Sequence, residues 1–293
     1  MVRPAAFNFN TQTAENNFFQ HKHDLSSDAL QQKVQEEFDN AVAALRESGI
    51  EVMVVEDTVD PPKPDAVFPN NWFCTMPGKS LQVFPMFAEN RRTEKRKDIV
   101  KQLVAVTDSG TVDDWSNYES AGAFLEGTGS MVFDHEHETA YAVLSERTAP
   151  GLFIKFCRTA GYTPYAFHAC DEFEQPIYHT NVILSLGKGF AILCDEAVED
   201  SDEKEELIAR LSDSGREVIC ITREQAKSFA GNMLQLKNRN DEPILVMSAS
   251  AHQSLGADTI EKIEENTRIL TVPVPTIESI GGGSIRCMMA ELF

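Results

Sequence analysis

Four pairs of short stretches along the chain alternate apolar and polar residues, and a polar or glycine-containing turn separates the members of each pair. The pairs begin at Asn71, Ser130, Asn181 and Asn232 and read NWFCTMPGKSLQVFPM, SMVFDHEHETAYAVLS, NVILSLGKGFAILC and NMLQLKNRNDEPILVMS. Alternation on both sides of a short turn predicts a β-hairpin. The starting positions are 59, 51 and 51 residues apart, so the chain contains an internal repeat.

A helical pattern and then a β-branched stretch follow each predicted hairpin. Apolar residues recur there every three or four positions, in segments 95–106, 151–167, 204–222 and 257–274. Residues 27–55 show the same order of helix, turn and strand without a complete hairpin of their own. We expect residues 5–10 (AAFNFN) and 284–292 (SIRCMMAEL) to supply the missing strands, which brings the two ends of the chain together.

Five such units predict an α/β protein, a pseudo-fivefold α/β propeller of repeated ββαβ units that forms one domain over residues 1–293. Pairing the first and last segments closes the ring and removes exposed sheet edges. The alternative is a doubly wound α/β sandwich with two hairpin insertions. A doubly wound sheet needs single strands that alternate with helices, whereas hairpins recur here.

Composition and charge narrow the class of protein. With 42% hydrophobic and 25% charged residues, the chain has the composition of a globular enzyme. A formal net charge of -20 argues against binding to nucleic acid or to an anionic membrane surface. The sequence shows neither a membrane-spanning apolar run nor a secretory leader, so we expect a cytoplasmic location. The six cysteines form no CxxC pair and fit neither a disulfide framework nor a zinc site.

Polar residues occupy equivalent positions at the entrances of the predicted hairpins. In a propeller these positions converge on the axis, and they hold Asn70, Asn71, Glu126, His179, Asn181 and, in the last unit, Cys287. A thiol becomes a nucleophile when a nearby cation ionises it, and a histidine can then move protons to and from the reacting groups. Taken alone, such a cysteine is more often a small buried apolar residue, so the joint placement carries the prediction of a nucleophilic site.

Two other patterns have simpler interpretations. DHEHE (134–138) falls in the predicted turn of the second hairpin, where solvation alone accounts for charged residues, so we predict no metal site. The glycines of GTGS (127–130) and GGG (281–283) lack the lysine and the strand–loop–helix context of a phosphate loop. We expect them to let the backbone turn sharply and approach a ligand.

Five segments, PDAVFPNNWF, ENRRTEKR, LEGTGS, HTNVIL and GGGSIRC, resemble the guanidino-group-modifying enzyme superfamily, or pentein fold. This superfamily includes arginine deiminases, dimethylarginine dimethylaminohydrolases, arginine:glycine amidinotransferases and citrulline-utilisation hydrolases. The resemblance extends over the whole chain through the repeat. It implies that Cys287 is the nucleophile, that His179 is the general acid and base, and that Glu126 contacts both that histidine and a substrate nitrogen.

The resemblance also implies a set of substrate-binding residues. Asp65 matches the acid that binds the substrate amino group, and Asn70 and Asn71 lie at the first hairpin. Arg91 or Arg92 falls where an arginine clamps the substrate carboxylate, a task that suits a guanidinium fork. The alternative for both arginines is a solvated helix start, because ENRRTEKRK is a dense run of charge.

One departure from the superfamily pattern bears on the substrate. Arginine deiminases hold the guanidinium group with two aspartates, and the matching positions here are Asn71 and Asn181. Amides both donate and accept hydrogen bonds, which suits a neutral ureido group, and each lost charge-assisted bond removes about 1.5–3 kcal/mol of attraction for a cation. We therefore expect citrulline to be hydrolysed to ornithine, ammonia and carbon dioxide without a cofactor.

Several alternatives stay open at this stage. They are arginine deiminase, dimethylargininase or amidinotransferase activity on an arginine derivative and, in a different class, a non-catalytic propeller scaffold. The expected partner is a small amino-acid substrate, and the oligomeric state is not readable from the sequence.

Overall fold

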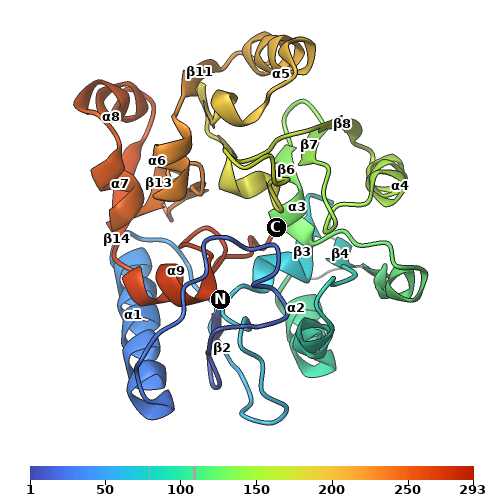
Figure 1. Ribbon diagram of the computed structural model, residues 1–293, viewed down its shortest axis with the longest axis vertical. Coiled ribbons are helices and arrows are strands. Elements are labelled where there is room, and N and C mark those ends of the chain that lie inside the picture. Colours follow the sequence, from blue (N-terminus) through green and yellow to red (C-terminus); the bar gives the residue numbers. More distant parts are fainter. Residues whose placement is uncertain (79, 108–109) are drawn as a thin grey trace.

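Small separate sheets, each with its own helices, make up the molecule (Figure 1). The computed structural model describes residues 1–78, 80–107 and 110–293, so Lys79 in the predicted turn of the first hairpin lies outside the described residues. The strands of the described residues form one two-stranded and four three-stranded sheets. In order, the three-stranded sheets contain β3 (Phe73–Met76), β4 (Ser80–Val83) and β5 (Thr111–Asp114); β6 (Val132–Asp134), β7 (Thr139–Val143) and β8 (Thr163–Phe167); β9 (Leu184–Leu186), β10 (Phe190–Leu193) and β11 (Glu217–Cys220); β12 (Leu234–Lys237), β13 (Pro243–Ser248) and β14 (Arg268–Val272).

All four predicted hairpins are confirmed. In every three-stranded sheet the first two strands pair antiparallel and the third strand adds in parallel to the second. In the first sheet, Phe73 lies opposite Val83, and Ser80 lies opposite Thr111. The parallel third strand requires a crossover connection, and the predicted helices provide it. The ββαβ repeat is thus present, and the separate sheets contradict the doubly wound alternative.

Helices lie at the periphery of the molecule, and the sheets lie nearer its centre (Figure 1). The crossover connections contain α2 (Lys97–Thr107), α4 (Pro150–Ala160), α5 (Ser201–Asp213), α8 (Ala257–Glu264) and the shorter α7 (Ala249–Ser254), whereas α6 (Arg223–Lys227) joins β11 to β12 of the next sheet. The acidic residues 199–206 contain the start of α5. There the Asp200 carboxylate accepts hydrogen bonds from the backbone N–H groups of Asp202 and Glu203. Negative charge at a helix N-terminus is favoured by the helix dipole.

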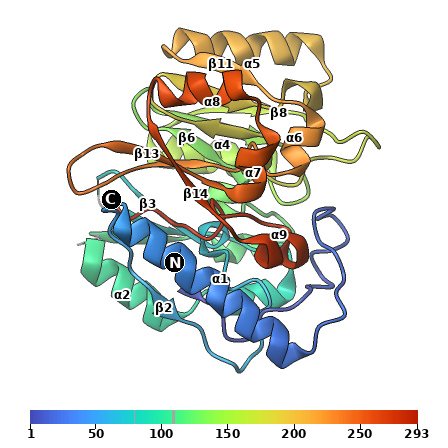
Figure 2. The same cartoon turned by 90° about the vertical axis from the view of Figure 1, so that its left-hand side faces the viewer.

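The first unit is built around α1 (Ser27–Glu47), which crosses one face of the molecule beside α9 (Pro275–Gly281) (Figure 2). Its buried face repeats every three or four residues, as Leu30, Val34, Phe38 and Ala41 show. This helix is followed by β2 (Val55–Glu56), as predicted. None of the described helices is long and apolar enough to cross a membrane.

The two terminal strands are not as predicted. The strand that pairs in parallel with β2 is β1 (Val2–Arg3), not residues 5–10. Residues 284–289 are a tight turn rather than a strand, because the N–H groups of Cys287, Met288 and Met289 each donate to the carbonyl three residues earlier. Residues 284–289 are all buried. They therefore lack the alternation of buried and exposed side chains that is typical of a strand with one face in solvent.

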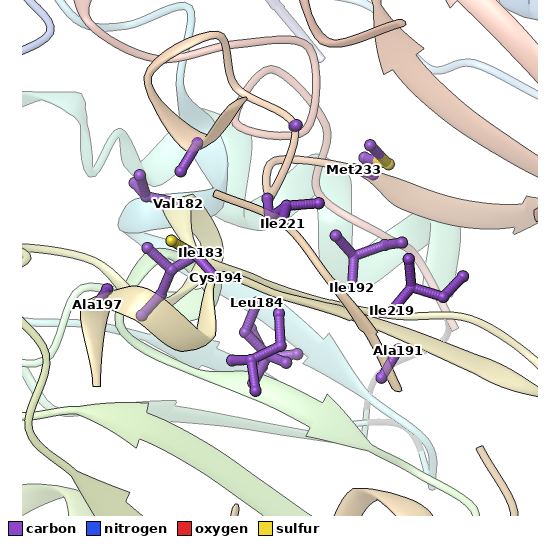
Figure 3. Packing of buried hydrophobic residues seen from close by; sticks show 14 of the residues in the cluster. Val182, Ile183, Leu184, Ala191, Ile192, Cys194, Ala197, Ile219, Ile221 and Met233 are labelled. Atoms are coloured by element: carbon purple, nitrogen blue, oxygen red, sulfur yellow. The ribbon is translucent and has the colours of Figure 1, made fainter. Parts of the chain in front are cut away.

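Apolar side chains from neighbouring units pack against one another between the sheets. One cluster combines β9, β10 and β11 with residues of the adjoining units, such as Val143 and Met247. Figure 3 shows Leu184, Ile192 and Ile219 in this cluster, with Val182 and Met233 at its edges. The hairpin entrances, which precede β9 and β12, are therefore anchored on a packed core.

Candidate functional site

Single helical turns at the hairpin entrances carry the predicted site residues. The turns are η1 (Pro69–Asn71), α3 (Gly127–Ser130) and η4 (Thr180–Val182), and α3 contacts both of the others. Asn71 ends η1, Glu126 precedes α3, and His179 precedes η4. Each of these three side chains is at least 97% buried. Repeat-equivalent positions therefore meet in space, as the sequence predicts.

Hydrogen bonds between the turns hold Glu126 and His179 in register. The Ser130 hydroxyl accepts from the N–H of Glu126 and donates to the carbonyl of Arg147, each over 2.8 Å. The Thr180 hydroxyl donates to the carbonyl of Ser130 over 2.6 Å. Gly127 has φ +48, and a Cβ there would lie 2.3 Å from the carbonyl oxygen of Asn70, so only glycine permits this approach.

His179 and Glu126 form a buried hydrogen-bonded pair. The Nε2 atom of His179 lies 2.8 Å from Oε2 of Glu126, and the Nη1 atom of Arg147 lies 3.6 Å from the same oxygen. Burial opposes the charge on Glu126, but Arg147 and His179 outweigh it and lower the pKa of Glu126 to about 2. Burial lowers the pKa of His179 to about 4 against the opposing effect of Glu126. At neutral pH the pair is therefore a carboxylate beside a neutral imidazole, which can accept a proton.

Two amide side chains contact the thiol of Cys287. The Nδ2 atom of Asn232 lies 3.4 Å from Sγ and also donates to the carbonyl of Asn181 over 2.8 Å. The Nδ2 atom of Asn181 lies 3.7 Å from Sγ. When the sulfur is a thiol, it can donate to Oδ1 of Asn232, which is 3.6 Å away. The sulfur of Cys287 is therefore contacted by amide N–H groups from two different hairpin entrances.

Arg91 determines how the Asn71 amide is turned. The Nη1 atom of Arg91 donates to Oδ1 of Asn71 over 2.8 Å, and because a guanidinium has only donors, the amide oxygen must face it. The Nδ2 atom of Asn71 therefore points away from Arg91. A Cβ on Gly129 would lie 2.4 Å from this Nδ2 and 2.8 Å from Cε1 of His179, so Asn71 and His179 both pack against the face of Gly129 that a side chain would occupy.

Arg91 is buried, so the interpretation of this residue as a solvated helix start is wrong. Its side chain binds the Glu94 carboxylate through Nε and Nη2 over 2.9 and 3.0 Å, and Nε lies 3.7 Å from Asp65. Burial alone would lower the pKa of Arg91, but Glu94 and Asp65 outweigh it and raise this pKa. The carboxylate clamp stays a prediction for Arg91.

The other predicted substrate-binding residues lie in different surroundings. Asp65 accepts from Nδ2 of Asn10 over 2.7 Å, and burial raises the pKa of Asp65. Asn70 is fully buried at the same turn as Asn71. Arg92 is 30% exposed, donates to the carbonyl of Met86 and lies over the ring of Phe124. Its role as a carboxylate clamp also stays a prediction.

Five buried polar atoms in this region have no hydrogen-bond partner within residues 1–78, 80–107 and 110–293. They are Oδ1 of Asp65, Nδ2 and Oδ1 of Asn70, Nδ2 of Asn71 and Oδ1 of Asn181. A buried polar group without a partner costs free energy. These atoms without a hydrogen-bond partner are the ones available to a polar ligand.

Sequence reasoning missed Asn232 and Arg147. Asn232 begins the fourth hairpin, as Asn71 and Asn181 begin or precede theirs, so the repeat itself held the signal. Arg147 follows β7 and donates through Nε to Asn16 over 3.0 Å, and no local motif indicates that it lies beside Glu126.

The DHEHE segment forms the β6–β7 turn, as predicted. The Asp134 carboxylate accepts from Nη1 of Arg216 over 2.5 Å and lies 3.0 Å from Nδ1 of His137. Throughout the described part of the chain, no group of three or more His, Cys, Asp or Glu side chains is placed to hold a metal ion.

Solved structures with the same fold are enzymes of arginine chemistry. The chain matches ArgZ, an arginine dihydrolase from the ornithine-ammonia cycle in cyanobacteria, with a TM-score of 0.74 and 17% identity over 100% of this chain and 40% of ArgZ. Against the N-terminal domain of ArgZ bound to substrate, the TM-score is 0.74 with 18% identity over 98% of this chain and 95% of that domain. The chain thus spans less than half of full-length ArgZ.

A dimethylarginine dimethylaminohydrolase, solved as an adduct with S-methyl-L-thiocitrulline, has a TM-score of 0.68 and 17% identity over 98% of this chain and 96% of that enzyme. A search of curated protein sequences returned no match. The family model for N,N dimethylarginine dimethylhydrolase, eukaryotic, matches residues 3–293.

The family-model match over residues 3–293 and the shared fold place the protein in the guanidino-modifying pentein superfamily, which includes hydrolases that act on C–N bonds of arginine-type groups. Within it, the chain belongs to the family of eukaryotic N,N dimethylarginine dimethylhydrolases.

Proposed function

We propose that this protein is a cysteine-dependent hydrolase of a linear ureido or guanidino amino acid, with citrulline as its substrate and ornithine, ammonia and carbon dioxide as its products. The observation that carries the proposal is a pair of buried amide atoms without a hydrogen-bond partner among the described residues. They are Oδ1 of Asn181, whose side chain contacts Cys287, and Nδ2 of Asn71 in η1.

These two atoms complement a ureido group. Because Arg91 binds Oδ1 of Asn71, the atom of this amide that lacks a partner is the donor Nδ2. Because Nδ2 of Asn181 contacts Cys287, the atom of that amide that lacks a partner is the acceptor Oδ1. A ureido group offers one carbonyl oxygen as an acceptor and N–H groups as donors. A guanidinium offers only donors and would leave Nδ2 of Asn71 without an acceptor, which is costly in a buried site.

The reaction proceeds through a covalent intermediate. Neutral His179 takes up the proton that the Cys287 thiol releases, and the thiolate adds to the ureido carbon. His179 then gives the proton to the departing nitrogen, so that ornithine leaves and a carbamoyl group remains on the sulfur. His179 next activates a water molecule, which releases carbamic acid, and this product breaks down to ammonia and carbon dioxide. Glu126 stabilises the imidazolium that forms in each half of the reaction.

A second candidate is hydrolysis of arginine to ornithine in two successive steps. ArgZ is an arginine dihydrolase, and AgrE has been solved with ornithine and NAD⁺ and, as a variant, with L-arginine. The ionised Glu126 supplies negative charge that would favour a guanidinium. In this candidate the amides would serve the second step, in which the ureido group is hydrolysed. Dimethylarginine is a third test substrate, because the family model carries that name.

Two finer statements about the fold belong to the same proposal. The first unit and the four ββαβ units form a closed pseudo-fivefold propeller, and residues 1–293 act as one catalytic domain. The arrangement of the units around a common centre in Figure 1 supports this view.

Steady-state assays with citrulline, arginine and dimethylarginine test the substrate preference. We expect the highest kcat/KM for citrulline. Faster turnover of arginine would overturn the role given to the two amides, and release of two equivalents of ammonia per arginine would identify the second candidate.

The Cys287→Ser variant tests the nucleophile. We expect a loss of turnover of at least about 10³-fold with little change in Tm, because serine is nearly isosteric but its hydroxyl is a far weaker acid and nucleophile than a thiol. Asn232→Ala serves as a comparison, since it removes a contact to the sulfur and leaves the thiol in place. A Cys287→Ser variant that keeps turning over substrate would end the covalent mechanism.

A further inference from the structure

A cavity lies against the turn of residues 284–289 that carries Cys287. Its volume is about 520 Å³, within the range of small-molecule sites. Arg286 lines this cavity, whereas the neighbouring Cys287 contacts Asn181 and Asn232. Ser185 and Gln235 also line it, from the strands that follow η4 and the fourth hairpin entrance.

Residues that line this cavity carry hydrogen-bond donors without an acceptor. Within the described parts of the chain, the Ser185 hydroxyl and Nε2 of Gln235 are buried without a partner. Oε1 of Gln235 accepts from the N–H of Lys188 over 2.8 Å, so the amide cannot reverse without losing this bond. Arg286 is 94% buried, and its Nη1 donates to the carbonyl of Met289 over 3.2 Å.

Arg286 makes no close ion pair. Among the described residues no carboxylate lies within 4.0 Å of its guanidinium nitrogens, and the buried carboxylate that acts on it from a greater distance is Glu291, which lines the same cavity. Burial lowers the pKa of Arg286 and raises the pKa of Glu291, so both charged forms are costly without a closer partner. The donors in the cavity that need a partner thus include a charged one.

The charge around the cavity has the opposite sign to that of the molecule. The chain carries a net charge of -20, yet the cations that line this cavity are Lys188, Arg216, Lys237 and Arg286, and the carboxylates are Asp134, Glu136 and Glu291. Arg216 neutralises Asp134 through the 2.5 Å contact. Lys188, Lys237 and Arg286 then outnumber the two remaining carboxylates, which favours an anion at this place.

We propose that this cavity is a second binding site, specific for a small organic or inorganic oxyanion, which the Arg286 guanidinium, the Ser185 hydroxyl and the Gln235 amide bind together. Carboxylate and phosphate share the acceptor geometry that matches a guanidinium fork. The site is separate from the catalytic residues and does not depend on which amino acid the enzyme hydrolyses.

Occupancy of this site affects the nucleophile. Arg286 and Cys287 belong to the same turn, in which the N–H of Cys287 donates to the carbonyl of Ser284 over 2.9 Å and the N–H of Met289 donates to the carbonyl of Arg286 over 3.2 Å. An anion that draws the guanidinium into the cavity shifts this turn. We therefore expect the bound anion to change the reactivity of the Cys287 thiol.

Isothermal titration calorimetry with citrate, succinate and inorganic phosphate, each at ionic strength matched with sodium chloride, tests the binding. We expect saturable binding of at least one of the three probes at one site. Absence of saturable binding of all three at concentrations of about 10 mM, which corresponds to only about 3 kcal/mol of binding free energy, would overturn the proposal.

Two nearly isosteric variants locate the site. Ser185→Ala removes one donor, and Gln235→Glu replaces a donor with a carboxylate while it keeps the acceptor for Lys188. We expect each to weaken binding by at least about tenfold, as the loss of a hydrogen bond to a charged group predicts. Gln32→Glu on the exposed face of α1 makes the same charge change elsewhere and should bind as the wild type does. Equal affinity in all four proteins would show that the anion binds elsewhere.

The coupling to Cys287 has its own measurement. Iodoacetamide alkylation is followed by mass spectrometry of the C-terminal peptide, because Cys220 is exposed and would otherwise contribute. We expect a saturating probe to change the alkylation rate of Cys287 at least twofold in the wild type and not in Gln235→Glu. An unchanged rate in the wild type with the probe bound would overturn the coupling.

Discussion

His179 and Glu126 lie at the centre of the candidate site, and each is almost fully removed from water. Burial disfavours the charged form of both side chains, but their partners act differently. Arg147 and Arg91 stabilise the Glu126 carboxylate and at the same time oppose a proton on His179. The folded protein therefore holds both pKa values below those of the unfolded chain, at about 2 for Glu126 and about 4 for His179.

This arrangement predicts how stability depends on pH. Between pH 6.5 and 4 the unfolded chain binds a proton at His179 that the native state excludes, so the free energy of unfolding falls as the pH falls through this window. Glu126 continues the loss in the same direction between about pH 4.5 and 2. We expect the free energy of unfolding, measured by urea titrations between pH 6.5 and 5, to change less steeply with pH in His179→Gln than in the wild type. An equal slope in the two proteins would show that His179 is not kept neutral by the fold.

Residue types at the candidate site could be predicted, but their orientations could not. The repeat predicts that Asn71, Glu126, His179 and Cys287 converge. His179 contacts Glu126, whereas Cys287 contacts Asn181 and Asn232, so its approach to His179 stays a prediction. The repeat does not indicate which end of an amide faces a ligand, because that depends on Arg91, which lies 20 positions away from Asn71. A side-chain rotation of this kind is determined by a tertiary partner.

At the scale of elements, the short turns η1, α3 and η4 are what position the chemistry. At Gly129 of α3, the side chains of Asn71 and His179 both occupy the space that a Cβ would need. The backbone conformation of Gly129 is open to any residue, so the close approach of two side chains is the reason for glycine here. An added methyl group would press against both residues.

Gly129→Ala should therefore reduce kcat by about 10- to 100-fold, since displacements of about 1 Å at a reacting centre cost rates of this order. The expected loss of stability is about 1–3 kcal/mol, the usual cost of overpacking. Gly151→Ala is the matched control, because no atom lies within 4 Å of a Cβ at that position. Assays of kcat with urea titrations of both variants check this prediction. Full activity in Gly129→Ala would show that Asn71 or His179 is free to move without consequence.

Element prediction succeeded where the pattern is local. The hairpins and the helices between them follow from alternation and from three- or four-residue spacing, because one side of each element faces the core. The segment 284–292 has the residue types of a strand, yet residues 284–289 form a turn that is buried on all sides. Without a solvent-exposed face, the sequence carries no periodicity that separates the two conformations.

At the scale of the whole molecule, the net charge of -20 creates a field that acts on a charged substrate before it reaches the site. Arginine carries a net positive charge at neutral pH, and citrulline carries none. Because salt screens long-range attraction, kcat/KM for arginine should fall about two- to fivefold between roughly 20 and 200 mM NaCl, and kcat/KM for citrulline should change less.

If arginine binds without turnover, its inhibition constant against citrulline replaces kcat/KM in this comparison. Sucrose at equal osmolarity serves as the uncharged control. An equal dependence of kcat/KM on NaCl concentration for arginine and citrulline would show that the net charge of the molecule has no effect on substrate capture.

The sequence by itself determined the order of the ββαβ units and the residue types at each hairpin entrance, because local periodicity and turn chemistry act within a few residues. The tertiary structure alone decided that Asn232 contacts the sulfur of Cys287, that Arg91 orients Asn71, and that Arg286 lines a cavity which the neighbouring Cys287 does not line. These features arise from packing between segments 20 to more than 50 residues apart, and the physical reason is that burial leaves each polar atom dependent on whichever distant partner the fold brings to it.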